Sequence, residues 1–159
     1  MNKYAFGIIL AALSTPVFAS GTHEGGHDKP MLIGEPGQKA KVTQTIKITM
    51  KETADGKMLF TPASFKVRAG QTVRLSIKNG GAMDHEFILD GEKEIMEHKA
   101  VMEKFPEMEH DDPNAVRLTA GESGEIIWKF TTGGTFKFAC LIPGHYAAGM
   151  HGDVVVAKK

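Results

Sequence analysis

A period-two alternation of apolar and polar residues, repeated in short segments, restricts most strongly how this chain can fold. The segments IKITMK (46–51) and VRLSIK (73–78) alternate in this way, so each has one side suited to a core and one suited to water. Further strands are expected at Ser64–Arg68, Met83–Leu89, Glu125–Phe130, Thr135–Cys140 and Asp153–Ala157. Glycine-rich turns separate them. Seven or so short strands predict an all-β sandwich of two antiparallel sheets.

The N-terminal part of the chain differs from the rest. Residues 1–19 combine one lysine, an apolar run and small residues near Ala19, which is typical of a secretory signal peptide. Residues 20–40 are rich in glycine and proline without an apolar period, which favours a flexible leader. We expect residues 41–159 to form one domain. No later stretch approaches the roughly 20 apolar residues of a membrane-spanning helix, so an exported, soluble protein is predicted.

The charge balance argues against two classes of partner. The chain has 19 Lys and Arg residues against 19 Asp and Glu residues. Nucleic acids and anionic membrane surfaces attract basic proteins, so this composition supports neither as a partner.

An insertion at residues 91–114 interrupts the strand pattern. Ile95, His98, Met102 and Phe105 recur at spacings of three and four, which predicts one stripe of a helix. A proline directly after Phe105 would end that helix. We therefore expect a partly helical insertion, longer than most connections in sandwiches.

The single cysteine, Cys140, begins the loop CLIPGHYAAGM, which also contains His145 and Met150. In a strand, alternate side chains point to the same face. In FKFAC the thiol lies on the same face as two phenylalanines, and in HEFIL His85 lies on the same face as apolar residues, so both side chains should face the core. A buried imidazole or thiolate costs free energy unless it is paired or ligated. A metal bound by His85, Cys140, His145 and Met150 would remove that cost.

Two imidazoles, one thiolate and one thioether form the ligand set of a type 1 copper site. Zinc favours nitrogen and thiolate donors without the thioether. Taken singly, each residue has a simpler interpretation: Cys140 as a small buried residue, His85 as a hydrogen-bonded core histidine, His145 as a loop histidine and Met150 as core filler. Their combination with a strand-rich pattern, export and a single cysteine favours one copper site.

The segments DHEF (84–87) and FKFACLIPGHYAAGMHGDVVV (136–156) resemble the cupredoxin family, which includes plastocyanin, azurin and pseudoazurin. The resemblance extends from about Lys41 and implies a Greek-key β-sandwich that binds copper. It also implies that His85, Cys140 and His145 are the equatorial ligands and Met150 the axial one. Many cupredoxins have an asparagine after the first ligand histidine, where this chain has Glu86.

The insertion sequence MEHKAVMEKFPEMEHDDPNA (96–115) is similar to a narrower group, the periplasmic copper-tolerance cupredoxins of the CopI type. That resemblance implies a location in the periplasm of a Gram-negative cell and a role in resisting excess copper.

Soft donors outside the main loop are candidates for additional, weaker copper binding. They lie in the leader and in the insertion: His23, His27, Met31, Met96, His98, Met102, Met108 and His110. A solvated leader and ordinary packing of methionines explain these residues equally well.

The leading functional hypothesis is an exported copper-binding redox protein that contributes to copper tolerance. The first alternative is a periplasmic electron carrier that docks a redox partner protein near His145, on an apolar patch of Pro143, Tyr146, Ala147 and Ala148. The second is a copper oxidase or nitrite reductase. Such enzymes generally need further copper sites and domains, so a chain of this size favours a binding protein over an enzyme.

Overall fold

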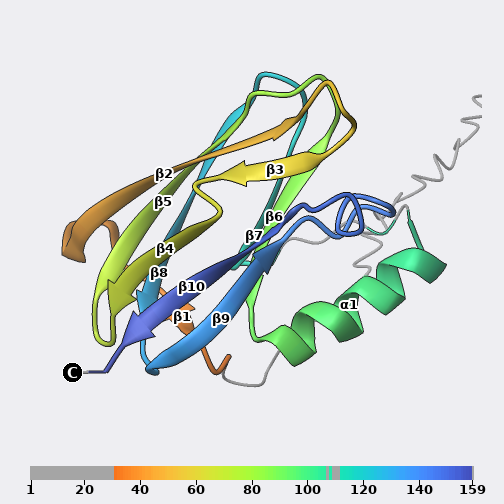
Figure 1. The fold of residues 1–159 in the computed structure, drawn as a ribbon. Helices are drawn as coiled ribbons and strands as arrows, with labels where there is room; N and C mark the ends of the chain where they lie inside the picture. Colours follow the sequence, from red (N-terminus) through yellow and green to blue (C-terminus); the bar gives the residue numbers. More distant parts are fainter. Residues whose placement is uncertain (1–30, 107, 109–111, 159) are drawn as a thin grey trace, which may run out of the picture.

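Two five-stranded sheets packed face to face, with one helix beside them, make up the computed structural model, which describes residues 31–106, 108 and 112–158 (Figure 1). The first sheet contains, in spatial order, β1 (Gly34–Pro36), β8 (Ser123–Phe130), β5 (Thr72–Asn79), β2 (Val42–Glu52) and β3 (Met58–Thr61). The second contains β4 (Ser64–Arg68), β10 (His151–Ala157), β9 (Gly134–Ala139), β6 (His85–Asp90) and β7 (Ala115–Leu118). A short 3-10 helix, Lys39–Lys41, precedes β2. The predicted all-β sandwich is confirmed.

The strand pairing is mixed, so the expectation of two purely antiparallel sheets is wrong. Strand β2 runs parallel to β5, with Ile46 opposite Leu75, and β4 runs parallel to β10, with Phe65 opposite Val154. The cause is the path of the chain, because β4 lies in the second sheet and the chain then returns to the first sheet at β5. A strand that returns after such a crossover can enter parallel to its neighbour. This non-sequential strand order is typical of Greek-key sandwiches.

An apolar cluster between the two sheets forms the main core. Phe60 contacts the rings of Phe87 and Phe138 edge to face, with ring centroids 5.8 and 5.1 Å apart. Cys140 and Met150 belong to the same cluster, and both are fully buried. The side chain of the single cysteine therefore enters the core, as the alternation predicts.

Helix α1 (Glu92–Lys104) lies against the outer face of the second sheet, beside β6 and β9 (Figure 1). Ile95 and Met102 of this helix pack on Ile88 and Ala139 in a second apolar cluster. Because the main core covers the opposite face, every residue of β6 is buried. The helix thus shields the sheet at the end where the cysteine lies.

The partly helical insertion is confirmed, with one correction to the predicted stripe. Ile95 and Met102 are buried and His98 is half-buried, but Phe105 is 60% exposed. Phe105 has non-helical φ and ψ angles of −132° and 70°. Pro106 follows it, and a proline disfavours the helical conformation of the residue before it. The stripe therefore ends one turn earlier than predicted.

The folded domain begins before residue 41. Strand β1 pairs with β8, and Ile33 is completely buried in the main core. A side chain at Gly34 would overlap the carbonyl oxygen of Lys129, so a glycine is needed where β1 approaches β8. The last part of the predicted flexible leader is therefore structured. The predicted signal peptide, residues 1–19, lies outside the described residues.

No helix in the described part of the chain is both long and apolar enough to cross a membrane.

The burial of Ile33 gives a test of this revised boundary. We expect Ile33→Ala to lower the free energy of unfolding of the metal-free protein by about 2 to 5 kcal/mol, because it leaves a cavity in the core. Leu32→Ala is the matched control, since Leu32 is 65% exposed and its loss should change stability by no more than about 0.5 kcal/mol. Urea unfolding followed by tryptophan fluorescence measures both. Equal effects of the two substitutions would contradict the packing of this segment.

Candidate metal centre

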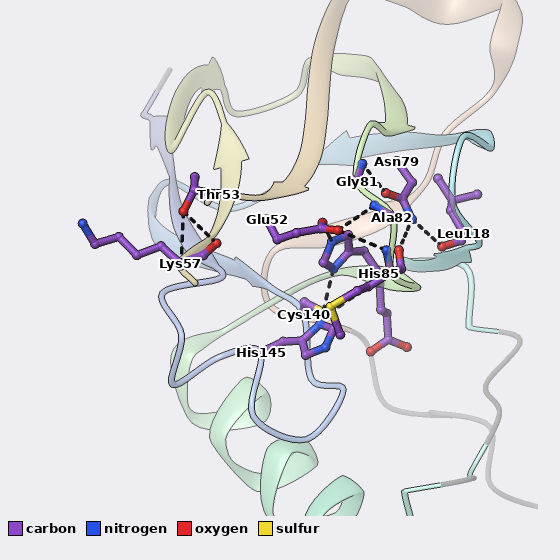
Figure 2. Close-up of polar contacts among 12 residues, drawn as sticks. Glu52, Thr53, Lys57, Asn79, Gly81, Ala82, His85, Leu118, Cys140 and His145 are labelled. Carbon is purple, nitrogen blue, oxygen red and sulfur yellow. Dashed lines mark hydrogen bonds and ion pairs between the residues drawn. The ribbon is translucent and has the colours of Figure 1, made fainter. Parts of the chain in front are cut away.

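Three buried side chains converge at one end of the sandwich. His85 is the first residue of β6, Cys140 directly follows β9, and His145 lies in the loop between β9 and β10. Their exposed fractions are 0%, 0% and 4%. Figure 2 shows the imidazoles of His85 and His145 on either side of the Cys140 sulfur. The structure thus brings together three of the four predicted ligands.

The loop that carries Cys140 and His145 is held by its own backbone. The amide of Cys140 donates to the carbonyl of Met150 at 3.0 Å, and the amide of Met150 donates to the carbonyl of His145 at 3.1 Å. Gly144 and Gly149 have φ angles of 89° and 103°, a conformation that other residues rarely adopt. The tight path of the loop therefore depends on glycine at both turns.

The donor atoms of the three side chains face one another. The Nδ1 atoms of His85 and His145 are 3.3 Å apart, and Cys140 Sγ is 3.3 Å from Nδ1 of His145. Two nitrogen donors bonded at about 2.0 Å to one metal ion lie about 3.3 Å apart at a near-tetrahedral angle. The spacing of the donors therefore fits a single metal ion. The set of two imidazoles and one thiolate suits copper.

Burial sets the protonation of the donors. It raises the pKa of the Cys140 thiol to about 12, although the amide of Glu86 donates to the sulfur at 3.3 Å. Burial, together with the neighbouring His85 ring, lowers the pKa of His145. Both groups are therefore neutral near pH 7 in the absence of a cation. Metal binding must displace the thiol proton, so metal affinity should rise with pH.

Two glutamates flank His85, and they are in different environments. Glu52, at the end of β2, places Oε2 3.0 Å from Nε2 of His85, and this hydrogen bond is the main cause of its pKa of about 2. Glu86 is 5% exposed, and burial raises its pKa although its carboxylate accepts a hydrogen bond from the amide of Leu141. Its Oε2 has no hydrogen-bond partner among the described residues. Glu86 can be recognised from the sequence because it follows His85 directly, whereas nothing local marks Glu52 as a neighbour of His85.

The comparison with known families decides the classification. A family model of copper-binding proteins, the plastocyanin/azurin family, matches residues 45–157, which include His85, Cys140 and His145. The chain belongs to the plastocyanin/azurin family of copper-binding proteins. The predicted cupredoxin resemblance and the predicted copper cofactor are therefore confirmed.

Individual relatives agree with this family assignment. The copper-resistant cuproprotein CopI of Rubrivivax gelatinosus is 44% identical over 156 residues, which cover 93% of this chain and 92% of that protein. The copper-resistant cuproprotein CopI of Pseudomonas aeruginosa is 35% identical, with 77% of this chain and 81% of that protein covered. Among solved structures, a dithionite-reduced auracyanin from Roseiflexus castenholzii superposes with a TM-score of 0.60 at 27% identity, over 73% of this chain and 98% of that one.

The fourth predicted copper ligand, Met150, lies at the end of the loop that carries Cys140 and His145. It is completely buried, and its backbone is hydrogen-bonded to both Cys140 and His145. It therefore lies where the loop returns to the sheet, beside the donor cluster.

The candidates for additional copper binding have varied environments. Met102 is buried and Met108 half-buried in the second apolar cluster, whereas Met96 is 45% exposed on the surface of α1. His98 is half-buried on the same helix, and Met31 packs against the main core. His23, His27 and His110 lie outside the described residues. Met31, Met102 and Met108 therefore take part in apolar packing.

The thiolate gives the centre its most direct spectroscopic test. We expect Cys140→Ser to abolish the intense thiolate-to-copper absorption of the copper-loaded protein, because no other cysteine exists in the chain to supply that transition. A titration with Cu(II) followed by visible absorption measures it. His151→Ala is the control, because His151 is exposed and adjacent to the loop. Strong colour in the Cys140→Ser protein would place the copper elsewhere.

Proposed function

We propose that this chain is a periplasmic copper-tolerance protein that holds one type 1 copper ion through His85, Cys140, His145 and Met150. The convergence of three buried donors at one point is the observation that carries the proposal. The likeness over nearly the whole chain to a copper-resistant cuproprotein supports the tolerance role.

The proposed ligands would supply three kinds of donor to the ion. His85 and His145 would hold the ion through imidazole nitrogen atoms, Cys140 would bind it as a thiolate after releasing its proton to solvent, and Met150 would add a weak thioether donor. Bound copper supplies a one-electron couple between Cu(I) and Cu(II). Since the second sheet and the loop backbone hold the donors, they need little rearrangement when the charge of the site changes. A buried centre of this kind suits either sequestration of copper or its redox handling.

The periplasmic location is part of the proposal and rests on the sequence. The first 19 residues have the pattern of a secretory signal peptide, and an exported protein would meet excess copper before it reaches the cytoplasm. The single thiol fits this compartment, because a cysteine bound to copper in the core is protected from oxidation.

Electron transfer to a partner protein is the second candidate function. The surface around His145 favours it, because Pro143 and Ala147 are exposed and Tyr146 and Ala148 are half-buried next to the buried imidazole. A small apolar surface next to a metal ligand is suited to brief contact with a redox partner.

The axial role of Met150 is tested by its replacement. We expect Met150→Leu to retain copper but to raise the reduction potential, because donation from the thioether to Cu(II) is lost. Met96→Leu is the control, since Met96 lies on the exposed side of α1. Protein-film voltammetry measures both variants. An unchanged potential in Met150→Leu would remove Met150 from the axial position.

The tolerance role is tested in cells. We expect a deletion strain to become sensitive to copper, and we expect the wild-type gene but not Cys140→Ser to restore growth across a copper series. Immunoblots of periplasmic extracts establish that both proteins accumulate equally. Unchanged copper tolerance in the deletion strain would overturn this role and favour the electron-carrier alternative.

A further inference from the structure

We propose that Glu52 is a positioning residue of the copper centre, which orients His85 and lowers the reduction potential of the bound copper. The proposal rests on the ligand set proposed above and adds a residue to it from the opposite sheet. Strand β2, which ends at Glu52, belongs to the first sheet, whereas His85 begins β6 in the second. Glu52 therefore connects the two sheets at the metal end of the sandwich.

The carboxylate of Glu52 fixes which nitrogen of His85 is free. Oε2 of Glu52 lies 3.0 Å from Nε2 of His85, and a carboxylate can only accept a hydrogen bond. Nε2 must therefore carry the proton, which leaves the lone pair of neutral His85 on Nδ1. This is the nitrogen that faces His145, 3.3 Å away (Figure 2). Carboxylates that contact metal-bound histidines in this way set the ring orientation and increase the basicity of the imidazole.

The carboxylate is itself held in place. Its other oxygen, Oε1, accepts hydrogen bonds from the amides of Ala82 and Met83 at 2.6 and 3.2 Å. Asn79 fixes this segment in turn, because its side-chain oxygen accepts from the amide of Gly81 at 2.9 Å and its amide donates to the carbonyl of Met83 at 2.8 Å. Glu52 therefore sits in a preformed backbone cradle.

Gly81 provides the space for this contact. A Cβ atom at Gly81 would overlap Oε2 of Glu52 and lie 3.1 Å from Nε2 of His85. The backbone of Gly81 does not have a positive φ, so its conformation alone does not require glycine. What requires glycine at this position is the close approach of the carboxylate.

The charge of Glu52 should act on the copper as well. The side chain is 23% exposed, while His85, to which it is bonded, is completely buried. A negative charge beside a ligand stabilises Cu(II) more than Cu(I), because the oxidised ion carries the greater positive charge. Glu52 therefore favours the oxidised state and lowers the reduction potential.

Three substitutions separate the charge of Glu52 from its position. Glu52→Gln keeps the size and an acceptor oxygen but removes the charge, whereas Gly81→Ala keeps the charge and displaces the carboxylate. Asp55→Asn is the matched control, because Asp55 lies in the turn after β2, is highly exposed and pairs with Lys57 rather than with the site. Each protein is loaded with copper and characterised by its reduction potential, visible absorption and Cu(II) affinity.

We expect Glu52→Gln to raise the reduction potential while the thiolate absorption persists. A tenfold loss of Cu(II) affinity relative to Cu(I) corresponds to a rise of about 59 mV. Gly81→Ala should lower Cu(II) affinity by about 10- to 100-fold, the usual effect of losing such a contact. Asp55→Asn should match the wild type in all three measurements.

The outcomes distinguish this proposal from the proposed ligand set. Wild-type potential and affinity in both Glu52→Gln and Gly81→Ala would overturn the positioning role, even if the unfolding of the metal-free protein changed. An equal rise in potential for Asp55→Asn would also overturn it, because the effect would then follow net charge rather than contact. Failure of the wild type to bind copper, or strong colour in Cys140→Ser, would contradict the ligand set instead.

Discussion

The pairing of β9 with β10 is the constraint on which the metal centre depends. The ladder places His151 opposite Ala139, and one step further the amide of Cys140 donates to the carbonyl of Met150. The loop between them is therefore closed by sheet hydrogen bonds. A loop closed in this way needs little further ordering when it binds a metal, because most of its conformational entropy is already lost on folding.

The second sheet has apolar clusters on both faces, and this explains why its metal end is so deeply buried. Alternate residues of β6 belong to different clusters, with Phe87 in the main core and Ile88 under α1. Helix α1 therefore contributes to the metal centre, since it covers the outer face of β6 and β9 near His85 and Cys140. Exclusion of water strengthens the electrostatic effect of each polar contact that remains at the site.

Local periodicity correctly predicted that several side chains face the core, because this depends only on the residues within one strand or helix. The inward direction of His85 and Cys140 follows from parity within their segments, and Ile95 and Met102 follow from helical spacing. The parts that were missed depend on partners distant in the sequence. Strand β1 is only three residues long and exists because it pairs with β8, and Glu52 reaches His85 because 33 residues of chain return to the same end of the sandwich. A period-two pattern within one segment contains no information on such pairings.

The two glutamates beside His85 differ in how well their surroundings stabilise the ionised carboxylate. Glu52 is surrounded by three N–H donors, which stabilise its ionised form, whereas burial raises the pKa of Glu86 and leaves one of its oxygens without a partner among the described residues. By strand alternation the side chain of Glu86 points to the opposite face of β6 from that of His85. Its backbone amide nevertheless donates to the sulfur of Cys140. The unfavourable burial of the Glu86 side chain therefore accompanies a backbone position from which its amide donates to the Cys140 sulfur. Rules of local stability are commonly broken in this way next to a functional centre.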